Sequence, residues 1–295
     1  MRDDGPVERR LQAGGLEQRL LIWEGDGPTL LLLHGFLDCA GSFAPLVRFL
    51  PPDYRIVALD FRGHGESAWV GPEAHYNFYD YVRDVRAVID QLDRERIFLL
   101  GHSMGGGVSL LFAGSWPEEV ERLVVVEGLG PPNESVEDGP ARMRRWIREE
   151  RRVADRGTRS FPDLLSVARR LQVRQPALEG ERALELAGWL AHEQQDGWTW
   201  RHDPRHQVRN PKIYRSSTYA PFVAEIGCPV LLVTGSESWY RWPDLEERRS
   251  HLRDWRRVDI EGASHMIHHD CPEPLAAAVA SFLAGAEPAA VLAGG

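Results

Sequence analysis

The sequence is poor in cysteine and in long apolar runs, and each shortage argues against particular classes of protein. Its three cysteines, Cys39, Cys228 and Cys271, are widely spaced and form no Cys-x-x-Cys pair. This pattern predicts free thiols in a reducing compartment, with neither a disulfide framework nor a metal site. No stretch approaches the roughly 18 consecutive apolar residues of a membrane-spanning helix. The first 15 residues are charged and lack the apolar core of a signal peptide, so we expect a cytoplasmic protein that does not bind membranes.

Basic charge is scarce as well. The chain of 295 residues holds 35 Lys and Arg against 44 Asp and Glu, for a formal net charge of −9. A nucleic-acid binder needs a basic surface, so this balance argues against one. Lys212 is the single lysine, which we interpret as a bias of genome composition. The 43% apolar and 27% charged residues are typical of a globular protein. The expected partner is a small-molecule substrate, and a monomer or homodimer is expected.

Apolar strand patterns alternate with helical patterns through the first half of the chain, which predicts the α/β class with a mainly parallel sheet covered by helices. The expected strands are Arg19–Trp23, Thr29–Leu33, Arg55–Leu59, Ile97–Gly101 and Leu123–Val126, followed late in the chain by Val230–Val233 and Arg256–Ile260. The expected helices are Phe78–Leu92, with Asn77 as its N-cap, and Leu275–Leu283.

The alternation stops between residues 131 and 225, where the charge changes too. This segment holds 17 basic and 14 acidic residues, whereas the remainder holds 18 and 30. Helical patterns cover Ala141–Asp155, Leu164–Leu171 and Glu181–Gln194, with Ser160 and Pro162 at the start of the middle one. We predict a helical lid at 131–225, inserted into a core of residues 1–130 and 226–295. A second, unrelated domain is the alternative, which the return of the strand pattern at Cys228 weakens.

The motif that carries chemistry is Gly101-His102-Ser103-Met104-Gly105, which follows an apolar strand and opens a helical pattern. In this context Gly-x-Ser-x-Gly predicts a nucleophile elbow, a sharp turn that holds the serine at the edge of the sheet. The Met104 N–H is then directed to where an oxyanion would form. Phe36, in the turn His34-Gly35-Phe36 after another strand, is the expected second oxyanion donor.

These segments resemble the α/β-hydrolase fold enzymes. The matching motifs are HGFLD, LDFRGHGES (59–67), GHSMGG (101–106) and GASHMIHHDCPEPL (262–275), in the order and places that the family has them. The resemblance covers about residues 16–130 and 226–285. It implies an eight-stranded sheet with an inserted helical cap, a serine nucleophile, a general-base histidine on a late loop and no cofactor.

His265 is the residue that the resemblance assigns as the base, since a serine needs a neighbouring imidazole to take its proton. His268 and His269 are nearby competitors, but GASH fits the family position better. By this resemblance, the usual family position for the acid matches Ser238, which cannot stabilise an imidazolium by charge. We therefore assign the acid to Glu127, at the end of the preceding strand, where a branch of the haloalkane dehalogenases carries Glu. Glu237 and Asp244 stay as alternatives.

Other polar and aromatic residues near these motifs receive weaker assignments. Asp60 is expected to anchor the Arg-Gly-His-Gly turn, and Asp38 to be a solvated loop residue. Aromatic side chains crowd the lid and the loop after the late strand, which favours an apolar or aromatic substrate. Candidate substrate-binding residues are His102, Trp198 and Trp239.

The function expected from these residues is that of a serine hydrolase with a Ser103-His265-Glu127 triad and an acyl-enzyme, acting on a carboxylic ester by default. A serine at 103 argues against dehalogenases and epoxide hydrolases, whose nucleophile in this family is a carboxylate. The alternatives on the same triad are an amidase, a thioesterase, a C–C bond hydrolase and a perhydrolase. A non-catalytic small-molecule receptor on the same fold is the alternative outside enzymes, and the missing Asp near 238 is its only support.

Overall fold

The computed structural model describes residues 5–92, 96–156 and 160–286. The two ends of the predicted core, 1–4 and 287–295, and residues 157–159 of the predicted lid lie outside the described residues. All three cysteines are free thiols, as predicted. Within the described ranges, none of the helices combines the length and apolar character that crossing a bilayer requires.

The centre of the molecule is an eight-stranded sheet in the order β1-β2-β4-β3-β5-β6-β10-β11. Only β2 runs against its neighbours, so the sheet is mainly parallel, as the sequence predicts. The strands are β1 (Val7–Ala13), β2 (Leu16–Trp23), β3 (Thr29–Leu33), β4 (Arg55–Leu59), β5 (Ile97–His102), β6 (Val120–Val126), β10 (Val230–Gly235) and β11 (Trp255–Ile260). Strand β1, an edge strand whose first four residues are exposed, was not predicted from the sequence.

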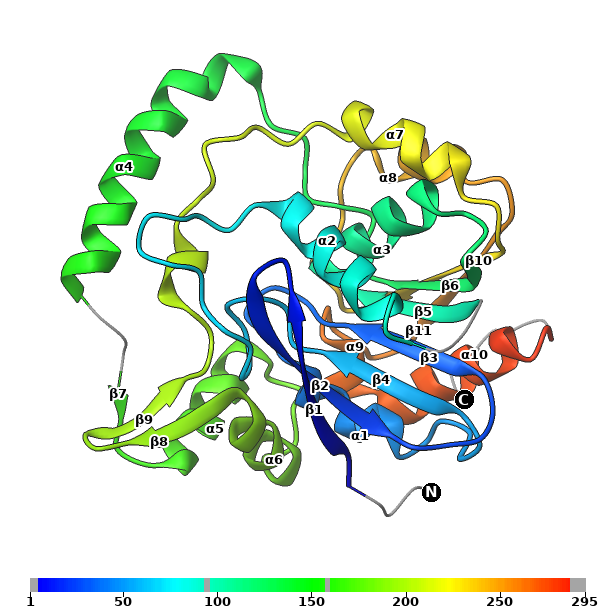
Figure 1. The fold of residues 1–295 in the computed structure, drawn as a ribbon, viewed down its shortest axis with the longest axis horizontal. Helices are drawn as coiled ribbons and strands as arrows, with labels where there is room; N and C mark the ends of the chain where they lie inside the picture. The colour runs from blue at the N-terminus through cyan, green and yellow to red at the C-terminus, as the bar shows by residue number, and fades with distance from the viewer. Residues whose placement is uncertain (1–4, 93–95, 157–159, 287–295) are drawn as a thin grey trace.

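Helices cover both faces of the sheet, which is why its central strands are apolar on both sides. All five residues of β3 are buried. Figure 1 shows α2 (Phe78–Ile89), α3 (Met104–Ser115) and α7 (Ser216–Glu225) on one side of the sheet. It shows α1 (Ala44–Val47), α9 (Ile267–Asp270) and α10 (Pro272–Leu283) on the other. The predicted N-cap of α2 is confirmed, since the Asn77 side chain accepts a hydrogen bond from the Tyr79 N–H.

The segment between β6 and β10 holds helices and a small antiparallel sheet in the order β7-β9-β8. Its elements are η2 (Val136–Asp138), α4 (Gly139–Arg156), β7 (Ser160–Phe161), α5 (Leu164–Arg174), α6 (Gly180–Leu190), β8 (Ala191–Gln194), β9 (Gly197–Trp200), η3 (Pro204–Gln207) and α7. The predicted helix Glu181–Gln194 is wrong in its last four residues, which form β8. Asp163, rather than Ser160, caps α5, because the Asp163 carboxylate accepts a hydrogen bond from the Ser166 N–H.

The helices between β6 and β10 differ in what they pack against. Helices α5 and α6 form a third apolar cluster with the small sheet. In Figure 1, α4 stands away from the central sheet, and none of its described side chains is buried. Helix α7 instead lies on α3, where a Cβ at Gly114 would overlap the backbone of Phe222. The division into core and lid stays a prediction, and α7 lies within the layer that covers the central sheet.

Candidate active site

Ser103 stands in the turn between β5 and α3, with φ of 51° and ψ of −111°. Glycines make this turn possible. A Cβ at Gly101 would overlap the backbone of Gly105, and a Cβ at Gly105 would overlap the Leu33 carbonyl. The turn therefore has the close backbone packing expected of a nucleophile elbow.

Residues with a positive φ, a strained backbone conformation, follow the carboxyl ends of three neighbouring strands. Leu37, Ser103 and Glu127 are the non-glycine residues with positive φ in the part of the chain that the structure describes. They follow β3, β5 and β6, which are adjacent in the sheet. A left-handed backbone costs free energy in a residue with a Cβ, and such strain is concentrated at functional sites. These three turns mark one edge of the sheet as the candidate site.

The side chains of Ser103, His265 and Glu127 form a chain of contacts at this edge. His265 Nε2 lies 3.0 Å from Ser103 Oγ, and His265 Nδ1 lies 3.2 Å from Glu127 Oε2. Ser103 is half-buried, His265 is buried and the Glu127 side chain is fully buried. With the ring proton on Nδ1, Nε2 can accept the Ser103 proton while the carboxylate faces the imidazolium that forms. This geometry can activate a serine hydroxyl as a nucleophile.

Glu127 is held by two further donors. The Gly235 N–H donates to Oε1 over 2.7 Å, and the Ser238 hydroxyl donates to Oε2 over 2.5 Å. Ser238, the residue that the sequence matched to the usual position of the family acid, thus hydrogen-bonds to Glu127. This contact of Ser238 was not predicted from the sequence. The alternative acids lie elsewhere, since Glu237 is exposed and Asp244 binds Arg248.

The His265 ring packs against two aromatic side chains, and its backbone carbonyl accepts a hydrogen bond. The Trp239 ring centroid lies 4.4 Å from that of His265, and the Tyr240 ring stacks at 5.8 Å. His102 Nε2 lies 2.9 Å from the His265 carbonyl oxygen, to which it donates. These contacts fix the ring orientation that points Nε2 at Ser103.

The two expected oxyanion donors lie at the same edge. Met104 is the first residue of α3, so its N–H has no intrahelical acceptor. Phe36 precedes the strained Leu37, whose N–H donates to His64 Nε2 over 3.2 Å. The His64 ring in turn stacks on His206 of η3 at 3.9 Å. Residues between β6 and β10 therefore support the loop that carries Phe36, a contact that the sequence does not signal.

Asp60 behaves as predicted, and Asp38 does not. Asp60 accepts hydrogen bonds from the Glu66 and Ala40 N–H groups and pairs with Arg19, which anchors the turn. Asp38 was expected to be solvated, but it is only 3% exposed, because His268 lies against it.

The histidines that competed with His265 are both buried and lie against other side chains. His268 Nε2 lies 3.1 Å from Asp38 Oδ2, and His269 Nδ1 lies 3.0 Å from the Gln175 side-chain oxygen. Burial lowers the pKa of each to about 3. Burial also lowers the pKa of His102 well below its usual value. One possible ligand atom from each of Asp38, His102 and His268 lies close to the other two. Among the described residues, these three form a group that could hold a metal ion.

The three candidate substrate-binding residues lie in different environments. Trp239 is 63% exposed and touches the base, so it borders the site. His102 is buried, and its hydrogen bond to the His265 backbone indicates support rather than substrate contact. Trp198 packs on the cluster of α5 and α6. Their roles in substrate binding stay predictions.

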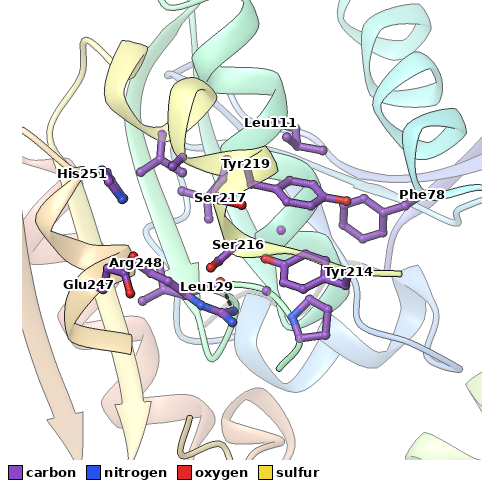
Figure 2. Close-up of a pocket in the computed structure, with 16 residues that line it drawn as sticks. Phe78, Leu111, Leu129, Tyr214, Ser216, Ser217, Tyr219, Glu247, Arg248 and His251 are labelled. Atoms are coloured by element: carbon purple, nitrogen blue, oxygen red, sulfur yellow. Dashed lines mark hydrogen bonds between the residues drawn. The ribbon is translucent and has the colours of Figure 1, made fainter. Parts of the chain in front are cut away.

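A pocket opens between α3, α7, α8 (Leu245–Ser250) and the loop after β6. Figure 2 shows the rings of Phe78, Tyr214 and Tyr219 along one side, with Arg248 and His251 across from them. The triad side chains do not line it. Its lining includes Gly107, Leu110 and Leu111 of α3, the helix that follows Ser103. It also includes Leu129, two residues after Glu127, so part of this lining is close in sequence to the site.

Known proteins resemble this chain over most of its length. A family model described as the alpha/beta hydrolase fold matches residues 28–272. A serine hydrolase-like protein of Danio rerio is 29% identical over 278 residues, covering 90% of this chain and 85% of the relative. A hypothetical protein of Pseudomonas aeruginosa PAO1 has a solved structure with a TM-score of 0.85 and 31% identity, covering 94% of this chain and 99% of that one. A thioesterase domain from the curacin biosynthetic pathway has a TM-score of 0.80 and 26% identity, covering 92% and 98%.

Proposed function

The chain belongs to the alpha/beta hydrolase fold family, and from that membership we propose that it is a serine hydrolase cleaving a carboxylic ester or a related acyl bond. The observation that carries the proposal is the contact chain from Ser103 Oγ through His265 to Glu127, with separations of 3.0 and 3.2 Å. Similarity to a serine hydrolase-like protein and to a thioesterase domain supports the same reaction class.

Acylation begins when Ser103 Oγ attacks the carbonyl carbon of the substrate and His265 Nε2 takes the hydroxyl proton. The negative charge that develops on the carbonyl oxygen is stabilised by the N–H groups of Phe36 and Met104. Glu127 holds the Nδ1 proton and stabilises the imidazolium. His265 then gives its proton to the leaving alcohol or thiol as the bond to the acyl carbon breaks.

Deacylation repeats these steps with water. His265 Nε2 takes a proton from a water molecule, whose oxygen attacks the acyl carbon of the Ser103 ester. The tetrahedral intermediate collapses, the carboxylic acid leaves, and the proton returns to Ser103 Oγ. Every proton in this mechanism thus moves through His265 Nε2, so the position of this ring is critical. Its support comes from the donors that hold Glu127 and the His265 carbonyl and from the aromatic rings beside it.

Aromatic side chains near the site support an apolar or aromatic small-molecule substrate. Trp239 lies against His265 and is largely exposed. The pocket of Figure 2 offers the rings of Phe78, Tyr214 and Tyr219, and its lining also includes Gly107 and Leu129, which follow Ser103 and Glu127 in the chain by four and two residues. A flat or apolar acyl group fits such a lining better than a charged one.

A pre-steady-state assay with p-nitrophenyl esters of increasing acyl length tests the proposal. We expect a burst of p-nitrophenolate close to one per chain, because these activated esters acylate the serine faster than water removes the acyl group, so that the acyl-enzyme accumulates. Ser103→Ala is expected to abolish both burst and turnover. Thioester and anilide analogues with the same acyl group then rank the bond type. Failure of all three classes to turn over, with the variant binding them as well as the wild type, would favour a receptor.

A further inference from the structure

A second constellation of donor atoms lies beside the triad. We call it the buried histidine cluster, and it consists of Asp38, His102 and His268. One ligand atom from each of the three lies within 4.8 Å of the other two. The three residues are at most 3% exposed. They come from the loop after β3, the end of β5 and α9, so residues far apart in the chain meet here.

The hydrogen bonds of the cluster determine where its protons lie. His102 Nε2 faces the His265 carbonyl oxygen, which can only accept, so Nε2 carries the proton and Nδ1 presents a lone pair. His268 Nε2 lies 3.1 Å from Asp38 Oδ2. Among the described residues, His102 Nδ1, His268 Nδ1 and Asp38 Oδ1 have no hydrogen-bond partner. All three of these atoms are acceptors, so the cluster has lone pairs in excess of donors.

The charge of Asp38 is also poorly matched. Its ion-pair partners in the described part of the chain are imidazoles alone, His268 at 3.1 Å and His269 at 3.9 Å. Both imidazoles are only 1% exposed, and burial disfavours the charged form of an imidazole. A buried carboxylate without a cationic partner is unfavourable. Neutral imidazole, on the other hand, is the form that ligates metal ions.

We propose that the buried histidine cluster binds one divalent transition-metal ion, with Zn²⁺ as the expected ion, through an Asp38 oxygen and a ring nitrogen of each of His102 and His268. Two imidazoles and a carboxylate are a donor set that suits Zn²⁺. Four ligands at about 2.1 Å stand about 3.4 Å apart in a tetrahedron. Ligand atoms that lie within 4.8 Å of one another must therefore close by at most about 1.4 Å. His269 Nε2, 3.9 Å from Asp38 Oδ1 and without a hydrogen-bond partner among the described residues, is a candidate fourth ligand.

The ion has a structural role in this proposal, and the proposal does not depend on the reaction assigned to Ser103. The ligands adjoin each part of the site: His102 precedes Ser103, Asp38 follows Phe36 by two residues, and His102 binds the His265 carbonyl. One ion would therefore tie together the loops that carry nucleophile, oxyanion donor and base.

Metal content after refolding tests the site, because buried ligands are accessible while the chain folds. The full-length protein is unfolded with chelator, refolded with or without ZnCl₂, desalted and analysed by mass spectrometry of the metal. We expect close to one Zn²⁺ per chain and a melting temperature several degrees higher with the ion. His268→Gln is expected to weaken binding about 100-fold or more, since a ligand is lost. Co²⁺ in its place should give the visible absorption of a tetrahedral site.

Two control variants separate this site from other imidazoles. His75→Gln removes an exposed histidine paired with Glu150 and should leave metal content unchanged. His265→Gln should also retain the ion, which distinguishes the cluster from binding at the base. Loss of the ion in His265→Gln, its retention in a folded His268→Gln, or less than about a tenth of an ion per chain in the wild type would overturn the proposal. If His268→Gln does not fold, His102→Gln serves, since its amide can still donate to the His265 carbonyl.

Discussion

Replacing Glu127 by Gln tests the assignment of the acid to the end of β6. The carboxylate accepts from the Gly235 N–H at Oε1 and from the Ser238 hydroxyl and His265 at Oε2. An amide has one acceptor oxygen in place of two. The Gly235 N–H is fixed in the backbone, so the amide oxygen takes the Oε1 position and the NH₂ group falls beside His265 Nδ1.

This exchange reverses the tautomer of the base. The NH₂ group donates to His265 Nδ1, so the ring proton moves to Nε2, which then cannot accept from Ser103 Oγ. The wrong tautomer in a serine triad lowers kcat by about 10⁴, or roughly 5.5 kcal/mol of barrier. We expect a loss of that size in Glu127→Gln, with KM little changed because the carboxylate is fully buried and does not face substrate.

The assay is kcat and KM on the best p-nitrophenyl ester, with the melting temperature as a check on folding. Glu237→Gln is the matched control: it removes the same charge from an exposed site and should stay near wild-type activity. A Glu127→Gln enzyme within about tenfold of wild type, or an inactive Glu237→Gln, would refute the reasoning about the tautomer.

Three further predictions concern the same edge of the sheet and its supports. In the Glu127→Gln background, Ser238→Asp should restore kcat by at least about tenfold, because it returns a carboxylate beside the base; steady-state kinetics of the double variant checks this. Gly105→Ala should lower the free energy of unfolding by about 3 kcal/mol or more, since its Cβ would overlap a β3 carbonyl, whereas Gly188→Ala, in open space on α6, should raise it by about 0.5–1 kcal/mol; urea denaturation measures both. Burial lowers the pKa of His206 to about 3, so below the unfolded value of about 6.5 the unfolded chain binds more protons. Its contribution to stability is therefore complete above that pH and falls by about 1.4 kcal/mol per pH unit as the pH drops toward 3. Denaturation at pH 5 and 7 should show a smaller loss in His206→Phe.

Most of the central fold could be predicted from the sequence, because short stretches of the chain carry the patterns that indicate its strands and turns. Runs such as Thr29–Leu33 are apolar on both faces, and the glycines around Ser103 have no role except in a tight strand-to-helix turn. The hairpin of β8 and β9 was missed although Asp196-Gly197 carries its turn signal, and Gly197 has φ of +114°. Strands of four residues are too short for their alternation to stand out from helical periodicity.

The site was accessible only in part. Ser103, His265 and Glu127 were each suggested by a position in the chain relative to a strand. The buried state of Asp38 was not, since it depends on His268, 230 residues away in the sequence. The role of Ser238 was missed for a similar reason: a serine shows its hydrogen-bond partner only when the neighbouring strand is in place.

The most direct test of the central claim, a Ser103 activated by His265 and Glu127, is the rate of labelling by a fluorophosphonate, located by peptide mapping. We predict rapid labelling of the wild type at Ser103, none in Ser103→Ala, and labelling slowed by orders of magnitude in Glu127→Gln. Labelling at another residue, or an unchanged rate in Glu127→Gln, would contradict the claim.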